Sequence, residues 1–112
     1  MDDKDSYIAN AVEHGRCVEK GDYENGNVAI DLLMETLAKL RQHSDSGQST
    51  LLTLLSHPNG WVKLFAATHL LPTRGELAAS ILENLASGPQ SELEFNATMI
   101  LREWRAGRLK IP

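Results

Sequence analysis

Two pairs of residues have a spacing that could support chemistry on a helix. His14 and Cys17 are three residues apart, and Asp31 and Glu35 are four apart, so each pair shares a face wherever the chain is helical. A histidine with a thiolate can ligate a metal ion, and two carboxylates can hold a metal or transfer protons. A metal site needs further ligands, and no Cys-x-x-Cys or His-x-x-x-His is present. Helix surfaces explain both pairs better, and we predict neither a metal nor a cofactor.

Motifs for nucleophilic catalysis and phosphate binding are also missing from the sequence. There is no Gly-x-Ser-x-Gly elbow, and the glycines are scattered at the ends of expected helices instead of forming a phosphate-binding loop. His57 precedes Pro58 and is expected in a turn, whereas His69 is expected in the core. No reaction can be assembled from these residues, so we predict that the protein is not an enzyme.

Length and charge place limits on the class of protein. The chain has 112 residues, one cysteine and a net charge of −4, which predicts a single domain without a disulfide in a reducing cytoplasm. Because the first residues are acidic and contain no long apolar run, we expect no secretory signal. No apolar segment is long enough for us to expect a membrane span. Acids are concentrated in residues 1–26. This distribution argues against direct nucleic-acid binding and favours a basic protein partner.

Apolar periodicity predicts an all-α fold. We expect helices over residues 5–20, 24–42 and 50–56, one between Pro58 and Pro72, one from Thr73 to Ser87 and one from Ser91 to Gly107. Asp22 and Asn59 are expected N-caps, and Thr73 and Ser91 open capping boxes that Glu76 and Glu94 complete. Four expected core faces follow from the spacing: Ile8, Ala11, Val12 and Val18; Ile30, Leu33, Leu37 and Leu40; Leu77, Ala78, Ile81, Leu82 and Leu85; Leu93, Ala97, Ile100, Leu101 and Trp104.

The order of these helices predicts three antiparallel pairs in a short right-handed stack. Residues 47–71 and 73–107 repeat one theme, in which a helix and a breaker precede a helix with small residues on its core ridge. Such internal similarity is typical of an α-solenoid. We therefore expect one domain over residues 1–112, with a loop at 45–49 between the N-terminal helix pair and the two later pairs.

The segment from His57 to Leu70 resembles the HEAT-repeat signature, in which a proline precedes a Val-Arg/Lys pair and an Ala-Ala. Pro58, the pair Val62-Lys63 and the pair Ala66-Ala67 match it, with lysine where arginine is frequent. The whole chain also resembles a small bacterial domain family of unknown function, through the residues Gly21, Asp22, Asn27, His57, Pro58, Trp104 and Gly107. Members of such families are often encoded near toxins, and the resemblance implies an immunity role by that association.

A protein-binding surface is expected along the second helix of each pair. Acids beside methionine and tryptophan provide apolar anchors with electrostatic steering for a basic partner. A second apolar stripe, Trp61 with Leu64, Thr68 and Leu71, is either buried within the chain or covered by a partner. The expected partner-binding residues are Asp22, Glu24, Asn27, Asp31, Met34, Glu35, Trp61, Asn96, Met99 and Glu103.

The leading functional hypothesis is a cytoplasmic bacterial immunity protein that binds and neutralises a cognate, basic, nuclease-like toxin domain. One alternative is a general scaffold or adaptor subunit without a toxin link, which predicts a large apolar self-interface. Another is a small enzyme or metal-binding protein that uses His14 and Cys17.

Overall fold

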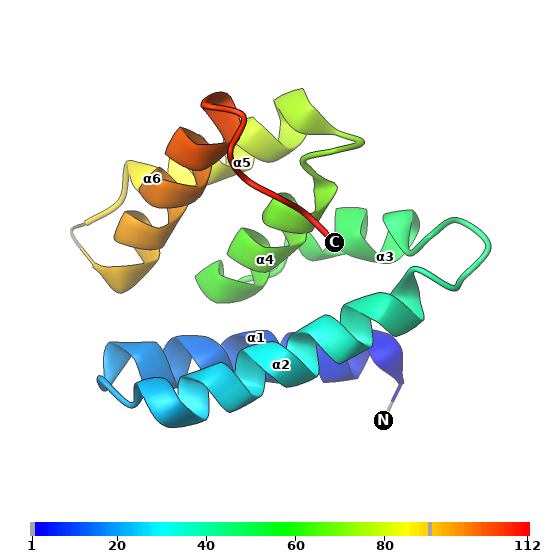
Figure 1. Ribbon diagram of the computed structural model, residues 1–112, viewed down its shortest axis with the longest axis horizontal. Helices are drawn as coiled ribbons and strands as arrows, with labels where there is room; N and C mark the ends of the chain where they lie inside the picture. Colours follow the sequence, from blue (N-terminus) through cyan, green and yellow to red (C-terminus); the bar gives the residue numbers. More distant parts are fainter. Residues whose placement is uncertain (1, 90) are drawn as a thin grey trace. The chain divides into compact units, whose positions relative to one another are not determined.

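The computed structural model describes residues 2–89 and 91–112, and over these residues the fold is all-α, without a strand (Figure 1). This confirms the predicted fold class. The helices are α1 (Asp3–Glu19), α2 (Tyr23–Leu40), α3 (Gln48–Leu54), α4 (Gly60–Leu70), α5 (Gly75–Ala86) and α6 (Glu92–Arg105).

Side-chain caps begin the helices at three of the four predicted positions. Asp22 accepts a hydrogen bond from the backbone of Asn25 at 3.2 Å, and Asn59 accepts from Trp61 at 2.9 Å and Val62 at 3.3 Å. Ser91 caps α6 through the backbone N–H of Glu94 at 3.2 Å. These bonds satisfy N–H groups that have no partner within their helices.

The predicted cap at Thr73 is wrong. Its hydroxyl lies 3.5 Å from the carbonyl oxygen of Leu70, in the last turn of α4, and α5 begins only at Gly75. Arg74 therefore occupies the cap position, and its side chain makes no capping hydrogen bond. The Thr73 side chain therefore contacts the end of α4, whereas the capping-box pattern predicted that it would begin α5.

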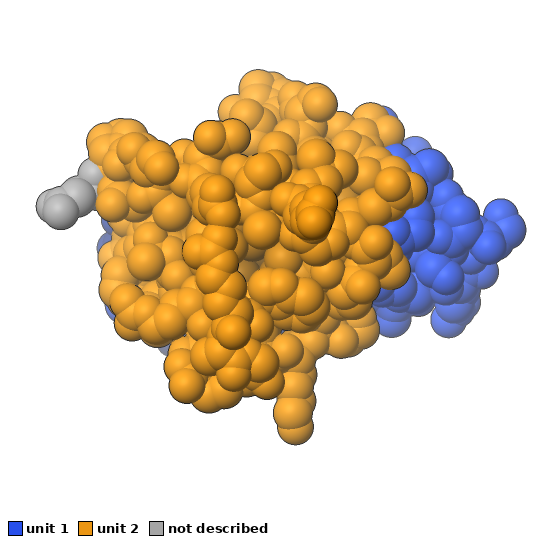
Figure 2. All heavy atoms as spheres, turned by 90° about the horizontal axis from the view of Figure 1, so that it is seen from above, with its two compact units in different colours: residues 1–50 blue, residues 51–112 orange. Residues whose placement is uncertain are grey.

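The chain divides into two compact units, residues 1–50 and residues 51–112 (Figure 2). In the first unit α1 and α2 lie side by side and run in opposite directions (Figure 1). Gly26 brings them close, because a Cβ there would stand 3.5 Å from the Cβ of Cys17. The ring Nδ1 of His14 donates to the carbonyl oxygen of Gly26 at 2.8 Å. Tyr7 and Leu33, which belong to this unit, are fully buried.

The loop after α2 ends two residues earlier than predicted. Asp45 accepts hydrogen bonds from the backbone N–H groups of Gly47 at 2.9 Å and Ser49 at 3.0 Å. Gly47 has a φ of +77° and packs on Leu40, where a Cβ would meet the Leu40 Cβ at 2.9 Å. The acid and the glycine together allow α3 to begin at Gln48.

In the second unit α4 packs against α5 and α6, and α5 packs against α6. Gly60 permits a close approach at the start of α4, since a Cβ there would clash with a methyl group of Leu93. The expected core residues Ala78, Leu82 and Ala97 are fully buried. The prediction that Leu77 lies in the core is wrong, because 44% of its surface is exposed. The stacking of three antiparallel pairs stays a prediction.

Candidate functional site

The outer face of α2 carries exposed apolar residues among acids. Its buried residues, such as Leu33 and Leu37, form one side of the helix. On the opposite side Val28 is 53% exposed and Leu32 is 45% exposed. Residues three, four or seven apart on a helix share a face. We call this surface the α2 stripe; it consists of Glu24, Val28, Asp31, Leu32 and Glu35, all of which are exposed.

The acids of the α2 stripe have no charged partner among the described residues. Across the described residues, neither an ion pair nor a side-chain hydrogen bond engages Glu24, Asp31 or Glu35. Exposed carboxylates beside two aliphatic side chains give a surface with both apolar contact area and a negative potential. Lys39, in the last turn, supplies the only cation of α2. Such a surface suits a basic partner.

The predicted partner-binding residues on or beside α2 have different surroundings. Three of them, Glu24, Asp31 and Glu35, belong to the α2 stripe. Asn27 is exposed at the edge of the stripe, and Met34 is half-buried. Asp22 is already occupied as the cap of α2, where hydrogen bonds from the side chain and backbone of Asn25 lower the pKa of its carboxyl.

Trp61 is a core residue and not an exposed anchor. It is 5% exposed, Leu64 is 1% exposed, and Leu71 is 1% exposed. Three of the four residues of the second apolar stripe of α4 are therefore buried within the chain, and Thr68 is half-buried. His69 is likewise buried, at 4% exposure, and stacks on Phe65 with 6.3 Å between the ring centroids. The expectation of a core histidine is confirmed.

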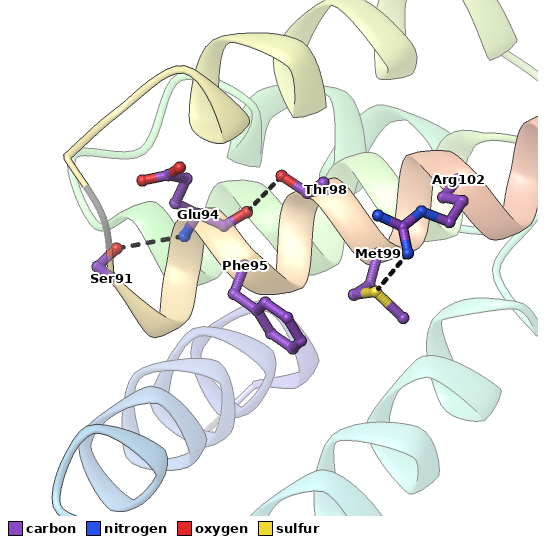
Figure 3. Close-up of a pocket in the computed structure, with 6 residues that line it drawn as sticks. All are labelled: Ser91, Glu94, Phe95, Thr98, Met99 and Arg102. Atoms are coloured by element: carbon purple, nitrogen blue, oxygen red, sulfur yellow. Dashed lines mark hydrogen bonds between the residues drawn. The ribbon is translucent and has the colours of Figure 1, made fainter.

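A second candidate surface follows one face of α6, along a hollow of about 330 Å³ (Figure 3). Phe95 projects from the helix and is 62% exposed. Met99 lies one turn further on, and its sulfur accepts a hydrogen bond from the guanidinium of Arg102 at 3.7 Å. The lining residues are Ser91, Glu94, Phe95, Thr98, Met99 and Arg102.

The charges of α6 are only partly paired. Arg105 forms an ion pair with Glu83 of α5, and Arg108 pairs with Glu103 at 2.7 Å. The Arg108 hydrogen bond lowers the pKa of the Glu103 carboxyl, so this predicted partner-binding acid is engaged within the chain. Arg102 makes no ion pair among the described residues.

Another predicted residue of α6, Asn96, is half-buried and donates its side-chain amide to the carbonyl oxygen of Glu92 at 2.7 Å. A second hollow, of about 460 Å³, lies between α5 and α6 and is bordered by the ion pair of Arg105 with Glu83. Its polar side chains are mostly engaged locally, since the Ser87 hydroxyl donates to the Glu83 carbonyl oxygen at 2.8 Å. This hollow offers fewer free groups than the face around Phe95.

The side chains of His14 and Cys17 form hydrogen bonds with different residues. His14 donates to Gly26, while the buried Cys17 donates to the carboxylate of Glu13 at 3.3 Å. Burial raises the pKa of the Cys17 thiol, and the hydrogen bond from Arg16 lowers the pKa of Glu13 to about 2. Within residues 2–89 and 91–112, no cluster of three or more His, Cys, Asp or Glu side chains has a geometry that could hold a metal ion.

Sequence reasoning missed the three most useful anchors, Val28, Leu32 and Phe95. The signal was available, because Val28 and Leu32 are four residues apart and lie off the core seam of their helix. Phe95 and Met99 have the same spacing on α6. A surface pair of large apolar residues at this spacing indicates an interaction site more strongly than the scattered acids do.

Comparison with protein-family models, with curated proteins and with solved structures finds no match for this chain. In the part of the chain that the structure describes, no helix combines the length and apolar character needed to cross a membrane.

Proposed function

We propose that this chain is a non-enzymatic protein-binding domain, and specifically a cytoplasmic bacterial immunity protein that covers a basic, nuclease-like toxin domain. One observation carries the proposal: the α2 stripe combines two exposed aliphatic anchors, Val28 and Leu32, with three acids that form no ion pair among the described residues. Large apolar side chains supply contact energy at an interface, and complementary charge speeds and orients association.

A nuclease is the kind of toxin that this surface suits best. Nucleases bind the phosphate backbone with lysine and arginine side chains. The carboxylates of Glu24, Asp31 and Glu35 would take the place of phosphates on such a toxin and block its substrate site. The resemblance to small bacterial helical families encoded near toxins supports the same function, and a HEAT-like stack of the helices is part of the proposal.

The test is to sequence the genes that adjoin this chain's gene for a basic, nuclease-like toxin domain and to co-express that domain with the chain. We expect the wild-type chain to restore growth and to co-purify with the toxin. Replacing Asp31 and Glu35 by lysine should lower affinity by at least about tenfold, because each reversal places like charges together. A double variant of Asp5 and Glu76 to lysine makes the same charge change at exposed positions outside the α2 stripe and should protect normally.

Two outcomes would contradict the proposal. One is toxicity that persists although the wild-type chain is well expressed. The other is equal protection by the α2-stripe variant and its control, which would show that the acids of α2 are not part of the interface. Co-purification of the chain with itself alone would favour the scaffold alternative.

A further inference from the structure

Two exposed stripes on different helices share one spacing and carry opposite charges. On α2, Val28 and Leu32 are followed three residues later by Glu35. On α6, Phe95 and Met99 are followed three residues later by Arg102. We call the second set the α6 stripe. Phe95 and Val28 are more than half exposed, and Glu35 and Arg102 are both exposed and without an ion pair among the described residues.

We propose that the α6 stripe is the docking site for the α2 stripe of a second copy of this chain. In a parallel alignment of the two helices, Val28 lies opposite Phe95, Leu32 opposite Met99, and Glu35 opposite Arg102. Side chains three apart on one helix fit between side chains four apart on another when the axes are nearly aligned, at about 20°, and each stripe contains both spacings. The contact therefore joins two apolar pairs and closes with one salt bridge.

Charges elsewhere on the two helices favour this alignment over the reverse one. In the parallel register Asp31 faces the neutral Thr98, and Glu24 faces the neutral Ser91. An antiparallel register that keeps the four apolar residues in contact would pair Val28 with Met99 and Leu32 with Phe95. It would also place Glu35 against Glu92, two like charges. Like charges directly opposed at an interface disfavour it.

The contact is of a kind that joins different patches on the two copies. Such a heterologous contact closes into a ring or pair when the geometry permits and otherwise extends into a chain. It covers few helical turns, so we expect reversible association that depends on protein concentration and weakens with salt. The contact also occupies the α2 stripe, so a basic partner bound there would release the second copy.

Sedimentation velocity of the purified chain at increasing concentration tests this inference. We expect the sedimentation coefficient of the wild type to rise with concentration. Glu35→Arg and Arg102→Glu should each weaken association by about tenfold, because each places like charges at the contact. An equimolar mixture of the two variants should associate again, to within about threefold of the wild type. The unchanged α2 stripe of Arg102→Glu meets the unchanged α6 stripe of Glu35→Arg, and the new arginine can meet the new glutamate.

Matched controls separate this contact from general charge effects and from folding. Asp5→Arg and Lys110→Glu make the same charge changes at exposed positions outside both stripes and should associate like the wild type. Far-UV circular dichroism should be the same for all variants. A wild type that remains monomeric at every concentration, or a variant mixture that stays dissociated, would overturn the inference.

This inference and the proposed function fail separately. Arg102→Glu leaves the α2 stripe intact, so it should still protect cells from the toxin even though its self-association is weakened. A chain that self-associates but does not protect would support the docking of a second copy and contradict the immunity role.

Discussion

Helices α2 and α4 both carry apolar residues outside one core seam, yet only α4 buries them. Eight of the eleven residues of α4 are buried, including Trp61 and Leu64. On α2, by contrast, Val28 and Leu32 remain about half exposed. Judged by composition alone, the tryptophan of α4 was the more attractive anchor for a partner.

The difference arises from the neighbours of each helix. Helix α4 packs against both α5 and α6, whereas the close helical neighbour of α2 is α1. A helix with neighbours on more than one side uses a second apolar stripe for its own core. A helix packed on one side leaves that stripe to water or to a partner. The same local pattern thus supports stability in α4 and recognition in α2.

The largest effect should follow from truncating the buried stripe. Trp61→Ala removes a side chain that is 5% exposed and should lower the free energy of unfolding by about 3–5 kcal/mol. Leu32→Ala, on the exposed stripe, should change it by less than about 0.5 kcal/mol. Urea denaturation followed by circular dichroism measures both. Similar losses in the two variants would remove the distinction between these helices.

A smaller effect should separate a real helix cap from one suggested only by the sequence. Asn59 accepts two backbone hydrogen bonds at the start of α4, so Asn59→Ala should cost about 1 kcal/mol. Arg74, and not Thr73, is the N-cap residue of α5, so Thr73→Ala should cost less than Asn59→Ala. The same denaturation experiment compares them. A larger loss for the threonine variant would restore the capping-box interpretation of α5.

Much of the fold could be predicted because it depends on local rules. The spacing of apolar residues and the capping residues predicted six helices, which the described part of the chain contains. The predicted core residues Leu33, Leu37 and Leu40 are buried. The errors at helix ends arose where one side chain had two possible partners. The Thr73 hydroxyl donates a hydrogen bond to the carbonyl oxygen of Leu70, three residues earlier. The Asp45 carboxylate accepts one from the backbone N–H of Ser49, so α3 begins earlier than predicted.

The candidate surface could be predicted only in part, because exposure depends on tertiary neighbours. The acids of α2 were found, since charged residues seldom lie in a core. Trp61 was predicted to bind a partner but is buried, and Leu77 was predicted to lie in the core but is exposed. Spacing places Val28, Leu32 and Phe95 off the core seams of their helices, but only the packed structure shows that these three side chains are exposed.

The smallest predicted effect concerns pH and sharpens the same comparison, because the cap of α2 can be protonated and the cap of α4 cannot. Hydrogen bonds from the Asn25 side chain and backbone hold the pKa of Asp22 below its ordinary value. A carboxyl with a lowered pKa in the folded state stabilises the fold above its unfolded-state pKa, which is about 3.9 for aspartate. That contribution is lost as pH falls through the lower folded-state pKa.

An amide at the same position removes this dependence on pH. Asparagine also caps helices, but its amide has a single acceptor oxygen and cannot replace both hydrogen bonds from Asn25. Asp22→Asn should therefore be slightly less stable than the wild type at neutral pH and lose less stability on acidification. Denaturation midpoints measured from neutral pH down to about pH 3 should therefore fall further for the wild type than for the variant. Curves that stay parallel throughout would mean that Asp22 contributes nothing to acid sensitivity, and that the caps of α2 and α4 are equivalent.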